Sequence, residues 1–243
     1  RSHETDRERV VSNRISIAVL GGTGREGSGL AFRWALHGHH VIIGSRNVDK
    51  AVAAAEELNA LLAGRAHVRA AANADAASEA QIVVLTVPFS AQLETAQVVA
   101  AELHGKILVD VTVPLVPPVD RVHLPNGESA VLALQRLLGE RVKVVAAFQN
   151  VSATHLKDPA HEIECDVLVC GNDRAAREQV VNLARDAGMR ALHAGVLANS
   201  AAIEAITSVL IAINKHYKVP ASGLRITGVP LESRASTIKP ASS

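Results

Sequence analysis

The amino-acid sequence predicts an α/β fold with a doubly wound parallel sheet and a small C-terminal helical part. Short, almost continuous apolar runs alternate with segments of helical periodicity along most of the chain. Strands of this kind are typical of a parallel sheet that helices cover on both faces. The 243 residues are 48% hydrophobic but only 2% aromatic, so we expect an aliphatic, alanine-rich core. This length allows one core with a smaller appendage.

The expected strands and helices follow one another in a regular order. The strands should cover residues 15–20, 41–44, 67–70, 82–87, 107–113, 142–147, 166–170 and 189–194. The helices should cover residues 28–37, 91–103, 129–138, 174–187 and 199–217. The last helix is the most apolar, and its hydrophobic residues occupy more than one face. We therefore expect it to pack against the body of the protein or against a partner subunit.

A glycine-rich turn follows the first expected strand and opens the first expected helix. Gly22 permits a tight turn, Gly24 lets the backbone approach a pyrophosphate, and Gly27 lets the helix pack closely on the strand. Free N–H groups at the start of the helix attract phosphates. This strand–turn–helix context favours a dinucleotide-binding Rossmann domain, with Thr23 and Arg25 in the binding loop. The alternative is a glycine turn that binds nothing.

The end of the second expected strand indicates which dinucleotide binds. NAD sites generally carry an acidic residue there for the ribose 2′-hydroxyl, whereas this chain has Ser45 and Arg46. Arg46 can bind a 2′-phosphate through two parallel hydrogen bonds, and Ser45 can add a hydroxyl donor. Lys50 lies one helical turn further on. The sequence thus favours NADP over NAD, and the alternative is a solvated arginine at a strand end.

Two further features lie close to this expected site. Glu26 is inside the glycine loop, where a carboxylate would repel a pyrophosphate, so we expect its side chain to face outward as a first-turn helix charge. Val87, Pro88 and Phe89 end the fourth strand at the carboxyl edge of the sheet, where ligands of such folds bind. We expect this turn to lie beside the cofactor, although an ordinary strand-to-helix turn explains it equally well.

Several classes of function have no support in the sequence. A net charge of +1 gives no basic surface for nucleic acid or an anionic membrane. Cys165 and Cys170 should point to opposite faces of a strand, which suits neither a disulfide nor a shared metal. Free thiols and a charged N-terminus favour a cytoplasmic location. The histidines around Gly38 indicate a turn rather than a metal site, and no nucleophile motif supports covalent catalysis.

Six segments together resemble the NADPH-dependent reductases of coenzyme F420, the 8-hydroxy-5-deazaflavin hydride carrier. They are GGTGREGSGLA (21–31), GSRNVDKA (44–51), VLTVPF (84–89), VKVVAAFQNVSA (142–153), CDVLVCGND (165–173) and LANSAAIEAITSVLIAIN (197–214). The resemblance runs from about Ile15 to Gly228. It implies hydride transfer between NADP(H) and coenzyme F420, small-molecule redox coenzymes as partners, and a homodimer.

The resemblance also implies which residues surround the two coenzymes. Thr23, Ser45, Arg46 and Lys50 match NADP-binding positions of the family. The nicotinamide and deazaflavin would lie near Val113, Pro114, Ala147, Gln149, Val151 and Leu224. Archaeal members carry His-Thr in place of Gln149-Asn150 and Trp in place of Phe89, so we expect different deazaflavin contacts here.

Hydride transfer between stacked rings needs mainly proximity, so we predict no essential catalytic side chain. Val151 should press behind the rings, the alternative being ordinary core packing. An imine or oxo-acid reductase that uses Asn214 or Lys215, and a non-catalytic NADP redox sensor, are the alternative functions. A short-chain dehydrogenase is excluded because Ala221 stands where the lysine partner of Tyr217, the single tyrosine, would be needed.

These expectations divide the chain into four parts. Residues 1–14 are expected to be a polar tail or the remnant of an expression tag, and residues 15–150 the NADP-binding Rossmann domain. Residues 151–228 should complete the deazaflavin pocket and make the dimer contact, and residues 229–243 should form a flexible tail.

Overall fold

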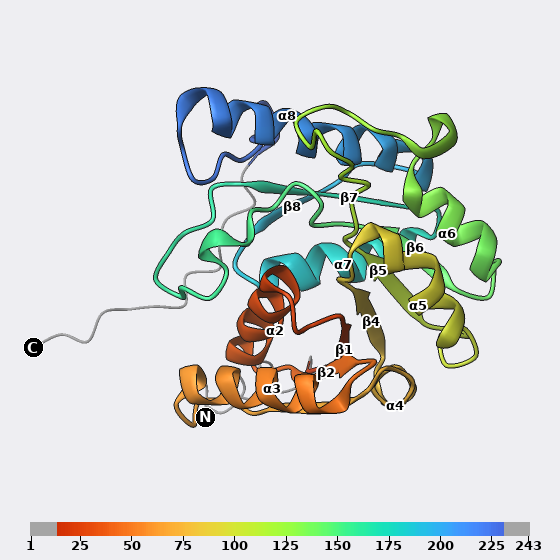
Figure 1. The fold of residues 1–243 in the computed structure, drawn as a ribbon, viewed down its shortest axis with the longest axis vertical. Helices are drawn as coiled ribbons and strands as arrows, with labels where there is room; N and C mark the ends of the chain where they lie inside the picture. The colour runs from red at the N-terminus through yellow and green to blue at the C-terminus, as the bar shows by residue number, and fades with distance from the viewer. Residues whose placement is uncertain (1–13, 231–243) are drawn as a thin grey trace, which may run out of the picture.

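One eight-stranded sheet organises the protein. The computed structural model describes residues 14–230, so the two expected tails lie almost entirely outside the described residues. The strands lie in the order β3-β2-β1-β4-β5-β6-β7-β8 (Figure 1). They are β1 (Ser16–Leu20), β2 (His40–Ser45), β3 (Val68–Ala72), β4 (Ile82–Leu85), β5 (Ile107–Asp110), β6 (Lys143–Ala146), β7 (Asp166–Gly171) and β8 (Arg190–His193). The expected Rossmann-type α/β fold is confirmed.

Helices connect and cover these strands. They are α2 (Arg25–His37), α3 (Val48–Leu62), α4 (Asn73–Glu79), α5 (Gln92–Val98), α6 (Ala130–Leu138), α7 (Arg174–Asp186) and α8 (Ser200–Tyr217). Two of them, α3 and α4, are not among the helices expected from the sequence. The start of α3 carries a recognisable signal, because the Asn47 side chain accepts a hydrogen bond of 3.2 Å from the Lys50 N–H as an N-cap.

The sheet is not parallel throughout. Strands β1 to β6 are parallel, whereas β7 is antiparallel to β6 and β8 is parallel to β7. The prediction of a wholly parallel sheet is therefore wrong for β7 and β8. Residues 147–165 between β6 and β7 contain only a short 3-10 turn and no crossover helix. The chain thus turns back at the edge where β6 ends, which an antiparallel pair allows and a parallel pair does not.

Two apolar layers lie on opposite faces of the sheet. Helices α2, α3 and α7 contribute to one layer, and α4, α5, α6 and α8 contribute to the other. Cys165 belongs to the first layer and Cys170 to the second, which confirms that these two free thiols face opposite sides. The core is aliphatic and alanine-rich, as expected from the composition. In Figure 1 the orange α3 and the blue α8 lie at opposite ends of the molecule.

Helix α2 is fixed to the loop that follows β6. The Arg33 guanidinium donates hydrogen bonds to the backbone carbonyls of Leu156 (2.8 Å), Ala187 (3.2 Å), His155 (3.2 Å), Asp158 (2.9 Å) and His161 (3.1 Å). These bonds satisfy carbonyls that have no partner in a sheet or helix. They also hold α2 in a fixed relation to residues 155–161 of the loop after β6.

Helix α8 is packed on the body through its polar residues. Leu197–Tyr217 is long and apolar enough to cross a membrane, with a mean hydropathy of 1.4. However, buried Glu204 accepts hydrogen bonds from the backbone N–H groups of Ala130 (2.9 Å) and Val131 (3.3 Å) at the start of α6. The Ser200 hydroxyl also donates to the Ser129 hydroxyl at 2.8 Å. These contacts agree with the expected packing of this helix against the protein.

Candidate functional site

A cavity of about 730 Å³ lies along the carboxyl edge of the sheet. Loops that follow β1, β2, β4, β5 and β6 form one side of it, and α8 and Ser222 complete it. This is the edge at which open α/β sheets bind ligands, and the volume suits a ligand pocket. One cavity therefore joins the Rossmann loop to the C-terminal part of the chain.

Most of the residues expected at the site line this cavity. They are Thr23, Gly24, Arg25, Glu26, Ser45, Arg46, Lys50, Val87, Pro88, Phe89, Val113, Gln149 and Val151. Gly22, Pro114, Ala147 and Leu224 are not among the lining residues. Ala147 is fully buried, and the Leu224 carbonyl accepts a hydrogen bond of 2.7 Å from the Asp166 N–H.

One side of the glycine loop packs closely against the protein, and the other side is open. A Cβ on Gly22 would lie 2.9 Å from the Val19 carbonyl oxygen, and a Cβ on Gly27 would lie 2.3 Å from Thr86 Oγ1. Both glycines are therefore needed for close packing of the loop on β1 and β4. A Cβ on Gly24 would meet nothing closer than 3.6 Å. The missing side chain at Gly24 leaves space for a ligand rather than for the protein.

The loop and the end of β2 together suit the phosphates of NADP. Gly24 is the N-cap residue of α2 and provides no side-chain cap, so the first N–H groups of the helix stay free for an anion. Arg46 has 73% of its side chain exposed, and its only ion pair in the described part of the chain is a long one of 4.0 Å to Glu94. Ser45 and Lys50 line the same end of the cavity.

Glu26 does not face outward, as the sequence analysis expects. Its side chain lines the cavity and is only partly exposed. Burial, and secondly the negative charge of Asp110, raise the pKa of Glu26 to about 8. Near neutral pH its carboxyl group is largely protonated, which removes the expected repulsion from a pyrophosphate.

Asp110, which the sequence analysis does not single out, is the centre of a buried polar network at the end of β5. Its carboxylate accepts hydrogen bonds from Gln92 Nε2, from the Thr112 N–H (3.1 Å) and from the Thr112 hydroxyl (3.1 Å). Burial raises the pKa of Asp110 to about 6, although these hydrogen bonds lower it in part. The sequence does contain a signal that could have identified Asp110. It is a lone acidic residue at the end of an apolar strand, at the sheet edge where ligands bind.

The opposite wall is formed by the turn after β6 and by α8. Phe148 has a φ of 72°, a left-handed conformation that is strained for a bulky residue, and this strain aims Gln149 at the cavity. The Thr207 hydroxyl of α8 donates to the Gln149 carbonyl at 2.8 Å. Gln149 is 4% exposed, and its Oε1 has no hydrogen-bond partner among residues 14–230. An unpartnered acceptor that lines a cavity suits a ligand that donates a hydrogen bond.

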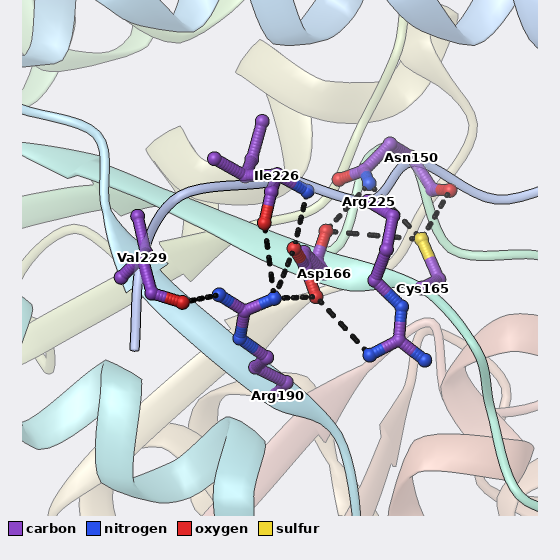
Figure 2. A network of polar contacts seen from close by, with 7 residues as sticks. All are labelled: Asn150, Cys165, Asp166, Arg190, Arg225, Ile226 and Val229. Atoms are coloured by element: carbon purple, nitrogen blue, oxygen red, sulfur yellow. Dashed lines mark hydrogen bonds and ion pairs between the residues drawn. The ribbon is translucent and has the colours of Figure 1, made fainter. Parts of the chain in front are cut away.

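A second buried polar network fastens the C-terminal segment behind this wall (Figure 2). Asn150 donates to the Asp166 carbonyl at 2.8 Å, and the Asp166 carboxylate accepts a 2.7 Å bond from the Ile226 N–H. Arg190 and Arg225 approach the same carboxylate at 3.1 Å and 3.9 Å. Because Asn150 and Ser222 both line the cavity, this network fixes the position of its far wall.

The histidines near Gly38 belong to the turn that the sequence predicts. Gly38 is the left-handed C-cap of α2, with a φ of 105°. His37 and His39 approach Asp186 at 3.2 Å and 3.0 Å, a grouping that could in principle hold a metal ion. However, His39 Nδ1 accepts a hydrogen bond from the Ile15 N–H at 3.3 Å, so the proton of a neutral ring lies on Nε2. A protonated Nε2 donates to Asp186 and is not a metal ligand.

Several polar lining residues are missed by the sequence analysis. Asn47, Asn73, Thr95, Thr112, Thr207 and Ser222 line the cavity and are not among the expected site residues. Asn73 is 7% exposed, and its Oδ1 is buried with no partner. Residues of this kind carry no motif, because distant segments of the chain bring them to one edge of the sheet.

The fold, the glycine loop and the cationic end of the cavity define an NADP-binding Rossmann oxidoreductase. A family described as "NADP oxidoreductase coenzyme F420-dependent" matches residues 16–114. The F420-dependent NADP reductase of Methanocaldococcus jannaschii is 41% identical over 225 residues, which cover 89% of this chain and all of the relative. The chain therefore belongs to the F420-dependent NADP reductase family.

Solved structures agree with this assignment. A candidate F420-dependent NADP reductase from Arthrobacter sp. FB24 superposes with a TM-score of 0.73 at 30% identity, covering 88% of this chain and 99% of that one. An imine reductase from Bacillus cereus has a TM-score of 0.56 at 17% identity, covering 84% of this chain and 63% of that one. The second likeness shows a shared fold alone.

Proposed function

We propose that this protein transfers a hydride between NADP(H) and the deazaflavin coenzyme F420. The observation that carries the proposal is the single cavity that joins the phosphate-binding loop to α8 and the Gln149 turn. Such a cavity lets two coenzymes meet within one protein chain. The relatives named F420-dependent NADP reductase support coenzyme F420 as the second molecule.

The residues of the loop and of β2 would hold NADP. Thr23, Gly24 and Arg25 line the cavity at the open N-terminus of α2, where a pyrophosphate is attracted. Ser45, Arg46 and Lys50 would bind the 2′-phosphate. The turn of Val87, Pro88 and Phe89 would lie against the middle of the cofactor.

The opposite half of the cavity would hold the deazaflavin. Val113 and Val151 offer apolar surface, and Gln149 offers the unpartnered acceptor. Pro114, Ala147 and Leu224 are outside the lining, and we propose that they support this surface, as Gly22 supports the glycine loop.

Bound NADPH supplies the hydride, and the protein supplies proximity. Among the described residues, the cavity lining contains no His, Cys or Tyr, and its lysine, Lys50, belongs to the 2′-phosphate end. The described lining therefore offers no thiol, imidazole or phenol near the ring-binding half. Holding two rings at a near-attack distance can provide several kcal/mol of barrier reduction, about 7 to 11 at most. We therefore propose that ring proximity, with no essential catalytic side chain, accounts for the reaction.

Oxidation of NADPH by the purified protein in the presence of coenzyme F420 tests the proposal. We expect F420 absorbance to decay under excess NADPH and no comparable turnover with free flavins or imines. Absence of any F420 bleaching by folded, NADPH-binding protein would contradict the function. A protein that binds NADPH without oxidising it, whatever acceptor is supplied, would instead be a redox sensor.

An imine or oxo-acid reductase is the second candidate, and one observation favours it. Asn214 on α8 lines the cavity, and its Oδ1 is buried with no partner, so it could bind a small polar substrate. Lys215 is not placed for this role, because its ammonium group pairs with Asp120 at 2.6 Å. The imine arm of the assay separates the two candidates.

We further propose a homodimer and a cytoplasmic location, with no nucleic acid or membrane partner. Val209, Ile213 and Tyr217 recur every four residues on α8 and are 41%, 37% and 68% exposed. Residues four apart lie on one face of a helix, so they form a continuous apolar stripe suited to a second copy of this chain. The buried free thiols agree with a reducing compartment.

A further inference from the structure

The ring-binding half of the cavity, formed by the end of β5, the turn after β6, α8 and Ser222, has a one-sided hydrogen-bonding surface. Its polar side chains are those of Thr112, Gln149, Asn150, Ser152, Thr207, Asn214 and Ser222. The cations of the cavity lining, Arg25, Arg46 and Lys50, belong to the glycine loop and to the residues near the end of β2. A ligand in the ring-binding half therefore meets neutral polar side chains, and the direction of their hydrogen bonds decides which ligand groups they can bind.

The four hydroxyl groups of this half donate their protons inside the protein. Their acceptors are a carboxylate, a hydroxyl and two main-chain carbonyls at 2.8 to 3.4 Å, in the pairs Thr112–Asp110, Thr207–Gln149, Ser152–Thr154 and Ser222–Leu210. Each hydroxyl has a single proton. None of these four protons is therefore free for a ligand.

The side-chain amides of Gln149 and Asn150 also donate inside the protein, but each leaves its oxygen free. Gln149 Nε2 donates to the Asp110 carbonyl at 2.9 Å. Asn150 Nδ2 donates to the Asp166 carbonyl at 2.8 Å. Exchanging nitrogen and oxygen in either amide would set two acceptors against each other, so these bonds fix the orientation of both groups. Both side chains are more than nine-tenths buried, and neither amide oxygen has a hydrogen-bond partner among residues 14–230.

These free oxygens determine what the ring-binding half recognises. A buried acceptor without a partner costs free energy, which a ligand that donates a hydrogen bond recovers. Asn214 on α8 adds a third such oxygen, Oδ1, to the same half. This part of the cavity therefore favours a ring edge that carries N–H groups over an edge that carries lone pairs.

We propose that Gln149 and Asn150 recognise the N–H groups of the reduced deazaflavin, so that the protein binds the reduced coenzyme more tightly than the oxidised one. The inference rests on the proposed function, because it takes coenzyme F420 as the ligand of this half. The pyrimidinedione edge of the oxidised ring has one N–H, at N3, whereas N1 carries a lone pair. In the reduced ring both N1 and N3 carry a proton. Reduction thus changes N1 from a group that an amide oxygen repels into a group that it binds.

The atoms and electrons of the reaction account for this new donor. The C4–H bond of the reduced nicotinamide breaks, and its electron pair forms the new C5–H bond of the deazaflavin. Electrons of the ring shift toward N1, which takes a proton from water. The described lining of this half contains no Lys, Arg or His, so it offers no cation to an ionised N1 and suits the protonated form. A tenfold preference for the reduced coenzyme raises its two-electron midpoint potential by about 30 mV.

Anaerobic titration calorimetry with each form of coenzyme F420, without any nucleotide, tests this inference. The reduced form is prepared with borohydride, and a slightly acidic buffer keeps the proton on N1. We expect the dissociation constant of the oxidised form to be about tenfold larger, because its N1 presents a lone pair to a buried acceptor. Equal constants for the two forms would overturn the inference and leave the proposed function intact, whether or not any variant folds. Binding of neither form would overturn both.

Gln149→Met removes the acceptor oxygen with little change of volume. We expect the ratio of its two dissociation constants to fall below about threefold, because the variant retains only the neighbouring amides as acceptors. A merely structural role of Gln149 would weaken both forms equally, and an unchanged ratio would overturn the inference. The matched control Gln179→Met, at an exposed position of α7 outside the cavity, should keep the tenfold preference.

The carboxamide of the nicotinamide is another N–H donor that Gln149 could meet, and oxidation of the ring leaves it unchanged. Binding of NADP⁺ and of NADPH to Gln149→Met separates the two donors. We expect both nucleotides to bind within about twofold of their affinity for the unmodified protein. A tenfold loss for both nucleotides, with the F420 ratio preserved, would show that Gln149 binds the carboxamide and would overturn the inference.

Discussion

Asp166 and Arg190 form a buried ion pair at the first residues of two adjacent strands, β7 and β8. Arg190 donates to the Asp166 carboxylate at 3.1 Å, and the Asp166 side chain has no exposed surface (Figure 2). The same guanidinium donates to the carbonyls of Ile226 and Val229, both at 3.2 Å. One ion pair therefore connects the sheet to the segment that carries Ser222 to the cavity wall.

Removing Arg190 should destabilise the protein strongly. Arg190→Ala leaves the Asp166 carboxylate buried without its main partner, which typically costs about 3 to 5 kcal/mol. Urea unfolding followed by circular dichroism measures this loss. The double variant Asp166→Asn with Arg190→Ala should be less destabilised than the single variant, since no buried charge remains. Arg141→Ala, at an exposed site, should change stability by less than about 0.5 kcal/mol. An Arg190→Ala variant as stable as this control would contradict the assignment.

Arg46 should select NADP over NAD. Arg46→Ala removes charge-assisted hydrogen bonds worth about 1.5 to 3 kcal/mol, so NADPH should bind about ten- to a hundredfold more weakly. Binding of NADH should hardly change, because it has no 2′-phosphate. Fluorescence titration with both nucleotides measures the two effects, and Arg141→Ala serves as the matched control. Equal losses for NADPH and NADH would show that Arg46 does not bind the 2′-phosphate.

Ring packing rather than proton transfer should govern the hydride step. Val151 is 8% exposed and lines the cavity, so Val151→Ala should loosen the packing and slow single-turnover reduction of F420 moderately. Lys215→Ala and His216→Ala should leave the rate nearly unchanged, because both residues are exposed and lie outside the lining. A general acid normally contributes about a hundred- to ten-thousandfold. A hundredfold loss in Lys215→Ala with normal NADPH binding would therefore overturn this mechanism.

The stability of the ligand-free protein should fall as the pH rises. Burial raises the pKa of Glu204 to about 7, and Asp110 adds to the effect, although the hydrogen bonds from Ala130 and Val131 oppose it. An acid whose folded pKa lies above its unfolded value of 4.5 favours folding below about pH 4.5 and loses that contribution as the pH passes 7. Each unit of difference between the folded and unfolded pKa values changes the free energy of unfolding by about 1.4 kcal/mol.

Glu204→Gln should reduce this pH dependence. Thermal unfolding between pH 4.5 and 8 compares the two proteins, and Glu140→Gln is the control. The variant should lose less stability over this range than the unmodified protein. A steeper fall in the variant would mean that Glu204 is stabilised as a carboxylate.

The apolar stripe on α8 should hold two copies of the chain together. Sedimentation at micromolar concentration should give the mass of a dimer, and Val209→Asp combined with Ile213→Asp should give a monomer with the same circular dichroism. Both residues are exposed in the single chain, so the substitutions should not disturb its core. A monomer in the unmodified protein would refute the dimer.

The positions of most strands and of the NADP end of the cavity could be predicted from the sequence, because both depend on local patterns. An apolar run marks a buried strand, and Gly24 with Arg46 marks a phosphate site. The direction of β7 could not be predicted, because the apolar pattern of a buried strand is the same in either direction. The raised pKa of Glu26 could not be predicted either, since its causes are burial and the charge of Asp110, which is far away in the sequence. The features that could not be predicted depend on contacts between residues that are far apart in the sequence.

The two ends of the cavity come from segments that are distant in the chain, and this separates the recognition of the two coenzymes. Ser45 ends β2 and Arg46 follows it, whereas Thr207 and Asn214 lie on α8. Substitutions at distant sites without shared partners usually have additive free energies. A redesign of residues 45 and 46 toward NAD should therefore combine freely with changes of α8 that accept other hydride carriers.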